Sequence, residues 1–251
     1  MTNGTQLVCA NIEGDLHLDK VCTFLQEQRA GVICLQEVFQ DDLHELLGRD
    51  YRWHFLPMTL KNRKSGHASA WGTAIAHRLP GELAMLDYYH RPTAVLVPFS
   101  EADKRPTIWH GVIGVKVASG EAAMNFYATH FTWTPDGAPD ANQRSDMKEL
   151  LALLAKQPAH VLCGDFNIPR KHNSLYETLV QRYTDHVPEE VTSSIYLPLH
   201  YVRHDRIKSA KLATFMVDYI FSRPQSCDIS NVRLHGGISD HFVLTADVAW
   251  P

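Results

Sequence analysis

Residues 161–169 have the sequence Val161-Leu162-Cys163-Gly164-Asp165-Phe166-Asn167-Ile168-Pro169, in which an apolar run ends in Gly-Asp-x-Asn. A short apolar run of this kind predicts a strand buried in a mixed or parallel sheet. Gly164 would let the backbone turn tightly as the strand ends, and Asp165 and Asn167 would project toward a common point. An acid beside an amide at a strand end can hold a water molecule or an oxyanion. The alternative is a strand followed by an ordinary Asx turn.

Strand-like and helix-like segments flank this stretch on both sides. A strand at 7–12, a helix at 15–28 and a strand at 32–35 make a layered α/β beginning. Further helices are predicted at 41–47, 142–156 and 175–182, and further strands at 51–56, 73–77, 83–89, 93–99, 107–117, 122–131, 214–221, 229–235 and 242–249. Residues 184–213 are predicted to be irregular. Because no linker or internal repeat is visible, we expect a single domain spanning residues 1–251.

The composition is that of a globular chain without a bulk positive charge. The 251 residues are 45% hydrophobic and 21% charged, with a formal net charge of −4. This length is enough for one large α/β domain with a substantial core. A nucleic-acid substrate is therefore allowed only through a local basic patch or a metal ion.

The cysteines and the N-terminus favour a cytoplasmic location. The five cysteines are an odd number without a CxxC pair, and Cys9, Cys34 and Cys163 lie inside apolar runs. Cysteine in such runs behaves as a small hydrophobe, which argues against a disulfide scaffold or a zinc site. No basic-then-apolar signal pattern opens the chain, and no apolar run approaches the roughly 20 residues needed to span a bilayer.

One segment, residues 57–70, concentrates positive charge. Lys61, Arg63 and Lys64 lie in it together with His67. We expect a loop whose cations contact phosphate oxygens of the substrate. The alternative is a solvated loop with no role in binding.

Polar residues recur at the ends of the predicted strands: Asn11, Glu37, His130, Asp165 with Asn167, Asp218, and Asp240 with His241. A buried carboxylate costs several kcal/mol unless it is paired or bound to metal. Oxygen ligands without a thiolate suit Mg²⁺ or Mn²⁺. Such ions bind substrate phosphate, so the pattern favours phosphoryl chemistry.

Each of these residues also has an ordinary structural explanation. Asn11 could cap the helix that follows it, and Glu37 could cap a helix or pair with a lysine. His130 could be a hydrogen-bonded histidine at a strand end, and Asp218 could belong to a buried ion pair. Asp240 and His241 could form a turn before the last strand.

Taken in order, these stretches resemble the endonuclease/exonuclease/phosphatase (deoxyribonuclease I-like) superfamily. The matching motifs are Asn11, Leu35-Gln36-Glu37-Val38, Thr129-His130, Gly164-Asp165-Phe166-Asn167, Val217-Asp218-Tyr219-Ile220 and Ser239-Asp240-His241. Each motif alone is weak, but six in the family's order between residues 11 and 241 are specific.

The resemblance implies both a fold and a set of roles. The fold is an α/β (in some schemes α+β) four-layer sandwich, with two mixed β-sheets flanked by helices. Glu37 would be the main ligand of Mg²⁺ or Mn²⁺, helped by Asn11 and Asp240. The implied catalytic set is Asp165 as the residue that activates water, Asn167 beside it, His241 donating to a phosphoryl oxygen, Asp218 fixing the tautomer of His241, and His130 stabilising the transition state.

The resemblance leaves the phosphoester open. Residues 128–131 read Ala-Thr-His-Phe, whereas the apurinic-endonuclease and exonuclease III branch has a Tyr-x-Pro-Asn/Gln element there. The Thr-His form is similar to the deoxyribonuclease I, sphingomyelinase, deadenylase and tyrosyl-DNA phosphodiesterase branches. We therefore expect a divalent-metal-dependent phosphoester hydrolase, with nucleic acid among the possible substrates and no membrane span. The alternative is a non-catalytic phosphate- or protein-binding module on the same fold.

Overall fold

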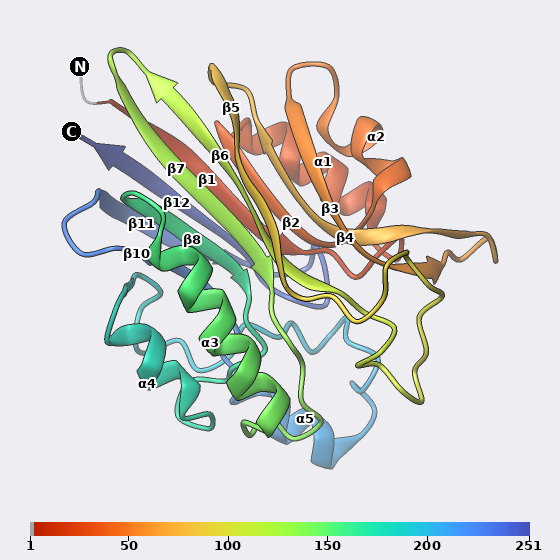
Figure 1. The fold of residues 1–251 in the computed structure, drawn as a ribbon. Helices are drawn as coiled ribbons and strands as arrows, with labels where there is room; N and C mark the ends of the chain where they lie inside the picture. The colour runs from red at the N-terminus through yellow and green to blue at the C-terminus, as the bar shows by residue number, and fades with distance from the viewer. Residues whose placement is uncertain (1–2) are drawn as a thin grey trace.

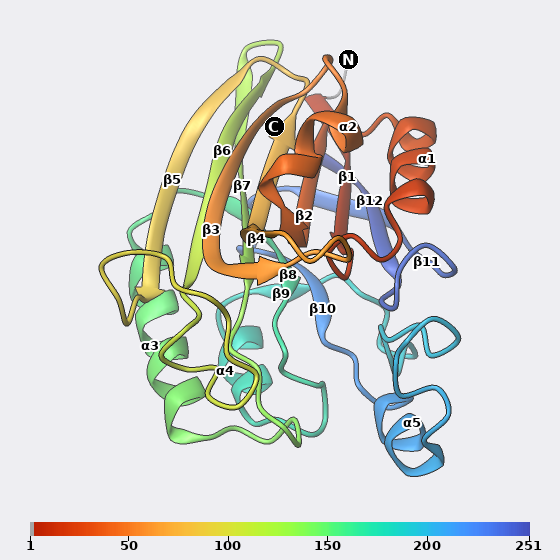
Figure 2. The ribbon, with the colours of Figure 1, turned by 90° about the vertical axis from the view of Figure 1, so that its right-hand side faces the viewer.

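The computed structural model describes residues 3–251, in which two six-stranded β-sheets pack face to face (Figures 1 and 2). In each sheet one neighbouring pair of strands is parallel and the other pairs are antiparallel. Sheet A contains, in spatial order, β11 (Asp228–His235), β12 (Val243–Trp250), β1 (Asn3–Asn11), β2 (Val32–Phe39), β4 (Ala68–His77) and β3 (Arg52–Asn62). Sheet B contains β5 (Gly81–His90), β6 (His110–Ser119), β7 (Ala122–His130), β8 (His160–Asp165), β10 (Asp218–Ser222) and β9 (Thr184–Asp185).

Helices cover the outer face of each sheet. On sheet A these are α1 (Leu18–Gln28) and α2 (Leu43–Leu47), the latter preceded by the 3₁₀ turn η1 (Gln40–Asp42). On sheet B they are α3 (Ala141–Ala155) and α4 (Leu175–Val180), while α5 (Arg206–Leu212) buries no side chain. The predicted four-layer α/β sandwich is therefore confirmed (Figure 2). No helix in residues 3–251 is long and apolar enough to cross a membrane.

The central strands are apolar without alternation because both of their faces are covered. In β1, Leu7 and Cys9 point into the core between the sheets, and Val8 and Ala10 point toward the helices. All four side chains are at most 2% exposed. This explains why the buried strands appear in the sequence as continuous apolar runs.

Gly164 lies inside β8, and not at the predicted turn after the strand. It pairs with Tyr219 on one side and with Thr129 on the other, and its φ is +145°. A Cβ at this position would lie 1.9 Å from the carbonyl oxygen of Thr129. Glycine here lets β7 approach β8 closely just before Asp165.

The N-terminus of α3 is anchored beside the two strand ends that precede and follow it. Asp140 caps the helix by accepting a hydrogen bond from the backbone N–H of Gln143 at 2.7 Å. The Gln143 side chain donates to the carbonyl oxygens of Thr132 at 2.7 Å and Asn167 at 3.2 Å. These bonds fix the chain just beyond β7 and β8.

Several predicted boundaries differ from the structure. The expected loop at 57–70 is mostly strand, because β3 continues through Pro57 to Asn62 and leaves only residues 63–67 as the hairpin turn. Pro57 is tolerated there because β3 is an edge strand with a register shift at that point. The predicted strand at 93–99 is wrong: that segment makes only the isolated bridge between Leu60 and Pro98. The segment expected to be irregular contains β9 and α5.

Candidate active site

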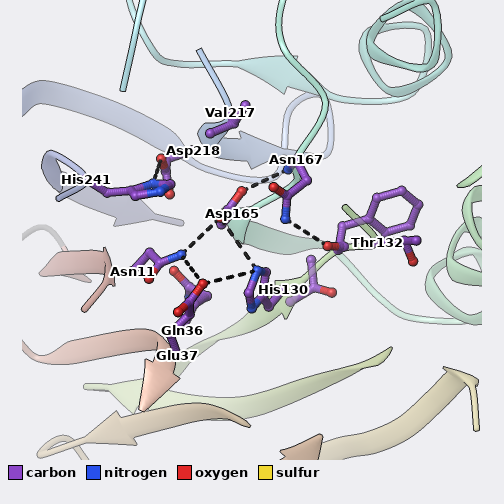
Figure 3. Close-up of polar contacts among 12 residues, drawn as sticks. Asn11, Gln36, Glu37, His130, Thr132, Asp165, Asn167, Val217, Asp218 and His241 are labelled. Atoms are coloured by element: carbon purple, nitrogen blue, oxygen red, sulfur yellow. Dashed lines mark hydrogen bonds and ion pairs between the residues drawn. The ribbon is translucent and has the colours of Figure 1, made fainter. Parts of the chain in front are cut away.

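The strand-end residues meet at one end of the sandwich (Figure 3). Since β7 and β8 are parallel, their carboxyl ends lie side by side, and His130 is the register partner of Asp165. β10 runs antiparallel to β8, so its first residue, Asp218, is the partner of Asp165 on the other side. On sheet A, Asn11 ends β1 beside Gln36 of β2. Both sheets therefore present polar side chains to the same space.

Asp218 and His241 form a buried hydrogen-bonded pair. Nδ1 of His241 donates to Oδ2 of Asp218 at 2.7 Å, and the hydroxyl of Ser194 donates to the same oxygen at 2.6 Å. Burial alone would lower the pKa of His241, but the Asp218 carboxylate raises this pKa well above its ordinary value. The contact with Asp218 fixes Nδ1 of His241 and favours the protonated imidazole, whose Nε2 can then donate a hydrogen bond.

Asp165 is held from three directions. It accepts hydrogen bonds from Nδ2 of Asn11 at 3.0 Å and from the backbone N–H of Asn167 at 2.8 Å, and its Oδ2 lies 3.6 Å from Nε2 of His130. Burial, with the nearby charge of Asp218, raises the pKa of Asp165 to about 6. The side chain of Asn167 is used elsewhere, because its Nδ2 donates to the carbonyl oxygen of Phe131 at 3.0 Å.

Glu37 reaches the site from a bulge in β2. The register with β4 shifts between Leu35 and Val38, and Glu37 has a φ of +57°, which is uncommon for a residue with a side chain. Its Oε1 accepts from Nδ2 of Asn11 at 3.2 Å, and its Oε2 lies 3.8 Å from Nζ of Lys61. Burial would raise the pKa of Glu37, but Lys61 and His130 lower it below the ordinary value.

Three carboxylates crowd together on the sheet A side. Burial raises the pKa of Asp240, and the charge of Glu37 adds to this effect. The pKa of Glu13 is raised to about 8 by burial and by the charges of Asp240 and Glu37. Burial is the main cause of both shifts, and the neighbouring carboxylates add to it. An oxygen-rich donor set of this kind fits a hard divalent cation.

Two of the predicted metal ligands, Asn11 and Glu37, are in contact, but the amide of Asn11 does not point its oxygen toward Glu37. Nδ2 of Asn11, and not its oxygen, lies between Glu37 and Asp165, and Oδ1 of Asn11 accepts from the backbone N–H of Glu13 at 3.2 Å. To bind a cation beside Glu37, the amide of Asn11 would have to turn over. The observed orientation of its amide therefore makes Asn11 a weaker candidate ligand than Glu37 or Asp240.

A different trio has the tightest geometry. In residues 3–251, Asp165, Asp218 and His241 each offer a ligand atom within 4.8 Å of the others. However, Nδ1 of His241 and Oδ2 of Asp218 already bind each other at 2.7 Å. We interpret this trio as a hydrogen-bonded cluster and not as a set of ligands.

The three predicted substrate-binding cations do not occupy equivalent places. Lys61 lies in the site, beside Glu37. Arg63 donates to Oδ1 of Asp42 at 2.6 Å, and Nζ of Lys64 donates to the carbonyl oxygen of Leu16 at 3.0 Å. Arg63 and Lys64 thus hold the β3–β4 turn against neighbouring segments.

Sequence reasoning missed three residues of the site. Ser194 binds Asp218 from a segment that carries no motif, so no sequence signal could have found it. Glu13 stands two positions after Asn11 and could have been included with it. His200, whose Nε2 lies 3.8 Å from Oδ2 of Asp240, is one of fifteen scattered histidines.

Comparison with known proteins was made for both sequence and structure. The model of the Endonuclease/Exonuclease/phosphatase family matches residues 8–241. A search of curated protein sequences found no match.

Solved structures with the same fold cover nearly all of this chain. An endonuclease/exonuclease/phosphatase from Beutenbergia cavernae DSM 12333 is 18% identical with a TM-score of 0.69, over 99% of this chain and 72% of that one. The human Nocturnin catalytic domain with bound sulfate anion is 16% identical with a TM-score of 0.68, over 99% and 94%. ANGEL2, described as a 2',3'-cyclic phosphatase and solved with adenosine-2',3'-vanadate, is 14% identical with a TM-score of 0.65, over 99% and 96%. At these identities the likeness is one of fold.

Proposed function

Because this chain belongs to the endonuclease/exonuclease/phosphatase family, we propose that it is a divalent-metal-dependent hydrolase that uses water to split a phosphodiester or phosphomonoester. The resemblance carried by the six sequence motifs is thereby confirmed. Members of the family are metal-dependent phosphoester hydrolases. The observation that carries the proposal is the buried Asp218–His241 pair beside Asp165, with Glu37 facing them from the other sheet.

The paired residues would bind and polarise the phosphoryl group. Asp218 fixes the proton on Nδ1 of His241, so Nε2 of His241 donates a hydrogen bond to a phosphoryl oxygen. His130 lies between Asp165 and Glu37, with its Nε2 3.6 and 4.0 Å from their oxygens, and would donate to an oxygen that gains charge in the transition state.

Asp165 is the carboxylate placed to orient the attacking water. Asn11 and the backbone of Asn167 hold it rigidly beside His130, and it would accept the proton that water gives up as the new P–O bond forms. The P–O bond to the leaving group breaks, and its electron pair stays on the leaving oxygen. That oxygen takes a proton from the site or from solvent and departs as the alcohol. Asn167 would support this step through its backbone, since its side chain is bound to Phe131.

Glu37 and Asp240, with Asn11 if its amide is turned over, would hold Mg²⁺ or Mn²⁺. When bound, the cation supplies positive charge to the phosphoryl oxygens. Glu37 keeps a charged carboxylate for this purpose because Lys61 and His130 lie near it.

We propose that the whole chain works as one catalytic domain, since the two sheets share one core and both contribute to the site. We also propose a cytoplasmic site of action. The five cysteines are free thiols, and such thiols persist in reducing compartments.

Hydrolysis of bis(p-nitrophenyl) phosphate with Mg²⁺ or Mn²⁺, and with EDTA, tests the proposed function. We expect turnover that EDTA abolishes and that either metal restores, and we expect Asp165→Asn to be inactive although it is still folded. Turnover that persists in EDTA would exclude the metal-dependent mechanism. A folded wild type that binds phosphate but hydrolyses no phosphoester would favour the non-catalytic binding module.

A further inference from the structure

Two large aromatic rings are exposed, whereas the other aromatic rings of the described residues are buried or half-buried. Among the Phe, Trp and Tyr residues in 3–251, only Trp133 and Tyr201 are exposed to solvent, with exposed fractions of 47% and 75%. Burying rings of this size is a large part of what stabilises a protein, so leaving two of them in water has a cost. Trp133 lies three residues after His130, and Tyr201 follows His200, which lies beside Asp240.

The first ring is joined to the site by a row of alternating cations and rings. Nζ of Lys104 lies 4.0 Å from the ring centre of Trp133 and 6.0 Å from that of Phe99. Nζ of Lys61 lies 5.7 Å from the ring centre of Phe99 and 3.8 Å from Oε2 of Glu37. The three lysine–ring distances are in the cation–π range. A continuous series of contacts therefore links the proposed metal ligand Glu37 to Trp133.

The second ring stands on the other flank. Tyr201 stacks on His200 with ring centres 4.6 Å apart and planes inclined by 29°. Nε2 of His200 lies 3.8 Å from Oδ2 of Asp240, the neighbour of His241. Figure 3 shows His241 and Thr132, which precedes Trp133, on opposite sides of Asp165. Strands β7 and β10 flank β8, so His130, three residues before Trp133, and Asp218, the partner of His241, lie on opposite sides of Asp165. Trp133 and Tyr201 are therefore connected to opposite sides of Asp165.

This arrangement matches the chemistry of an unpaired nucleic-acid strand. Nucleosides extend to both sides of a phosphodiester held at Asp165, and each base has a flat face that can stack on an exposed ring. Phosphates next to the scissile one would meet Lys61 and Lys104. In a duplex the bases already stack on one another, and a small phosphoester extends to neither ring.

We propose that the substrate is a single-stranded polynucleotide whose bases stack on Trp133 and Tyr201 on either side of the scissile phosphate. The inference rests on the proposed hydrolase function and deepens it by naming the substrate class. DNA and RNA share the stacking chemistry. Of the two cations that would contact phosphate, Lys61 and Lys104, Lys104 is the weaker, because Oε1 of Glu101 lies 2.8 Å from its Nζ; the Glu101 side chain is 78% exposed.

The test compares single-stranded DNA, single-stranded RNA and duplex DNA of one sequence, about twelve nucleotides long, a length within the range that such sites cover. The proteins are wild type, Trp133→Ala, Tyr201→Ala and the ring-preserving Trp133→Phe and Tyr201→Phe. Ile207→Ala, which removes an 84% exposed aliphatic side chain on α5, is the matched control.

Loss of either ring should raise KM for a single strand about tenfold, with a smaller change in kcat and little change for duplex. The Phe variants should restore most of the loss, and Ile207→Ala should match wild type. With two nearby cations, the logarithm of KM should rise with the logarithm of salt concentration with a slope of about 1.4. Cleavage of DNA alone or of RNA alone would identify the source of the strand.

Three results would overturn the proposal: equal KM for wild type and both Ala variants, equal losses on single strand and duplex, or no rescue by Phe. Wild-type hydrolysis of bis(p-nitrophenyl) phosphate without cleavage of any oligonucleotide would overturn it while the proposed function stands. Absence of all hydrolysis with Mg²⁺ and Mn²⁺ would overturn the proposed function itself.

Discussion

The carboxylates on the sheet B side and those on the sheet A side of the candidate site differ in their hydrogen-bond partners. In the paired half, Asp165 and Asp218 each accept short hydrogen bonds from donors that surround them. In the acidic half, Glu13, Glu37 and Asp240 lie close enough to raise the pKa of two of the three. In the paired half three of the four carboxylate oxygens are hydrogen-bonded, with Oδ1 of Asp218 the exception, whereas in the acidic half an added cation would offset the charge of neighbouring carboxylates.

The contrast separates two demands on the fold. Buried carboxylates with satisfied hydrogen bonds contribute to a rigid site. Carboxylates that repel one another lower stability and are kept where function requires them. The two halves should therefore respond differently when a carboxylate is removed.

The largest effect is expected for Glu37→Ala in the acidic half. It should lower kcat/KM for bis(p-nitrophenyl) phosphate by about 10³-fold or more, because the site loses its main cation ligand. The protein should remain folded, since Glu37 lies at a bulge of β2 and is not part of the hydrophobic core. The control is Glu27→Ala, which changes an exposed residue of α1. A normal kcat/KM in Glu37→Ala would remove Glu37 from the metal site.

Asp218→Asn should break the paired half. We expect kcat to fall about 100-fold and KM to change less, because the amide presents the wrong partner to Nδ1 of His241. The melting temperature should also fall, since hydrogen bonds to a charged group are lost. Asp185→Asn disrupts the buried pair of Asp185 with Arg170, so it should lower stability but keep kcat. Equal kcat losses in the two variants would mean that Asp218 acts only structurally.

A third comparison concerns Lys61 and Arg63, neighbouring cations with different partners. Lys61→Ala should raise KM for an oligonucleotide by about tenfold, because Lys61 lies beside Glu37. Arg63→Ala should instead lower the free energy of unfolding by about 1–3 kcal/mol, since Arg63 bonds the largely buried Asp42. The pair is measured by steady-state kinetics and chemical denaturation. If Arg63→Ala raised KM as much as Lys61→Ala, the whole turn would belong to the binding surface.

The smallest effect is the response of stability to metal. Saturating Mg²⁺ at about 100 times its Kd should stabilise wild type by about 2.7 kcal/mol, which calorimetry detects as a rise in melting temperature. Glu37→Gln should lose most of this rise, and Asp218→Asn should keep it. A rise of the same size in all three proteins would place the cation outside the acidic half.

The fold and most of the site could be predicted because buried strands leave a clear pattern. The apolar run that ends in Asp165 marks both β8 and the edge at which it ends, and the run before Glu37 marks β2, which continues past a bulge at Glu37 to Phe39. By contrast, Ser194 becomes a partner of Asp218 only through the path of a segment without a motif. The role of Arg63 depends on Asp42, which lies 21 positions earlier in the chain. Contacts set by tertiary structure do not show in local sequence.

The seam between the two sheets gives the site a mechanical property. The two halves stand on separate layers, and the buried side chains of Cys9, Cys34 and Cys163 lie in the core between those layers. The distance from Glu37 to Asp165 is thus set by how the layers rest on each other. Hydrostatic pressure, or a bulkier side chain in place of Cys163, would shift that distance while the protein is still folded. The catalytic rate would then report compression of the core before the protein unfolds.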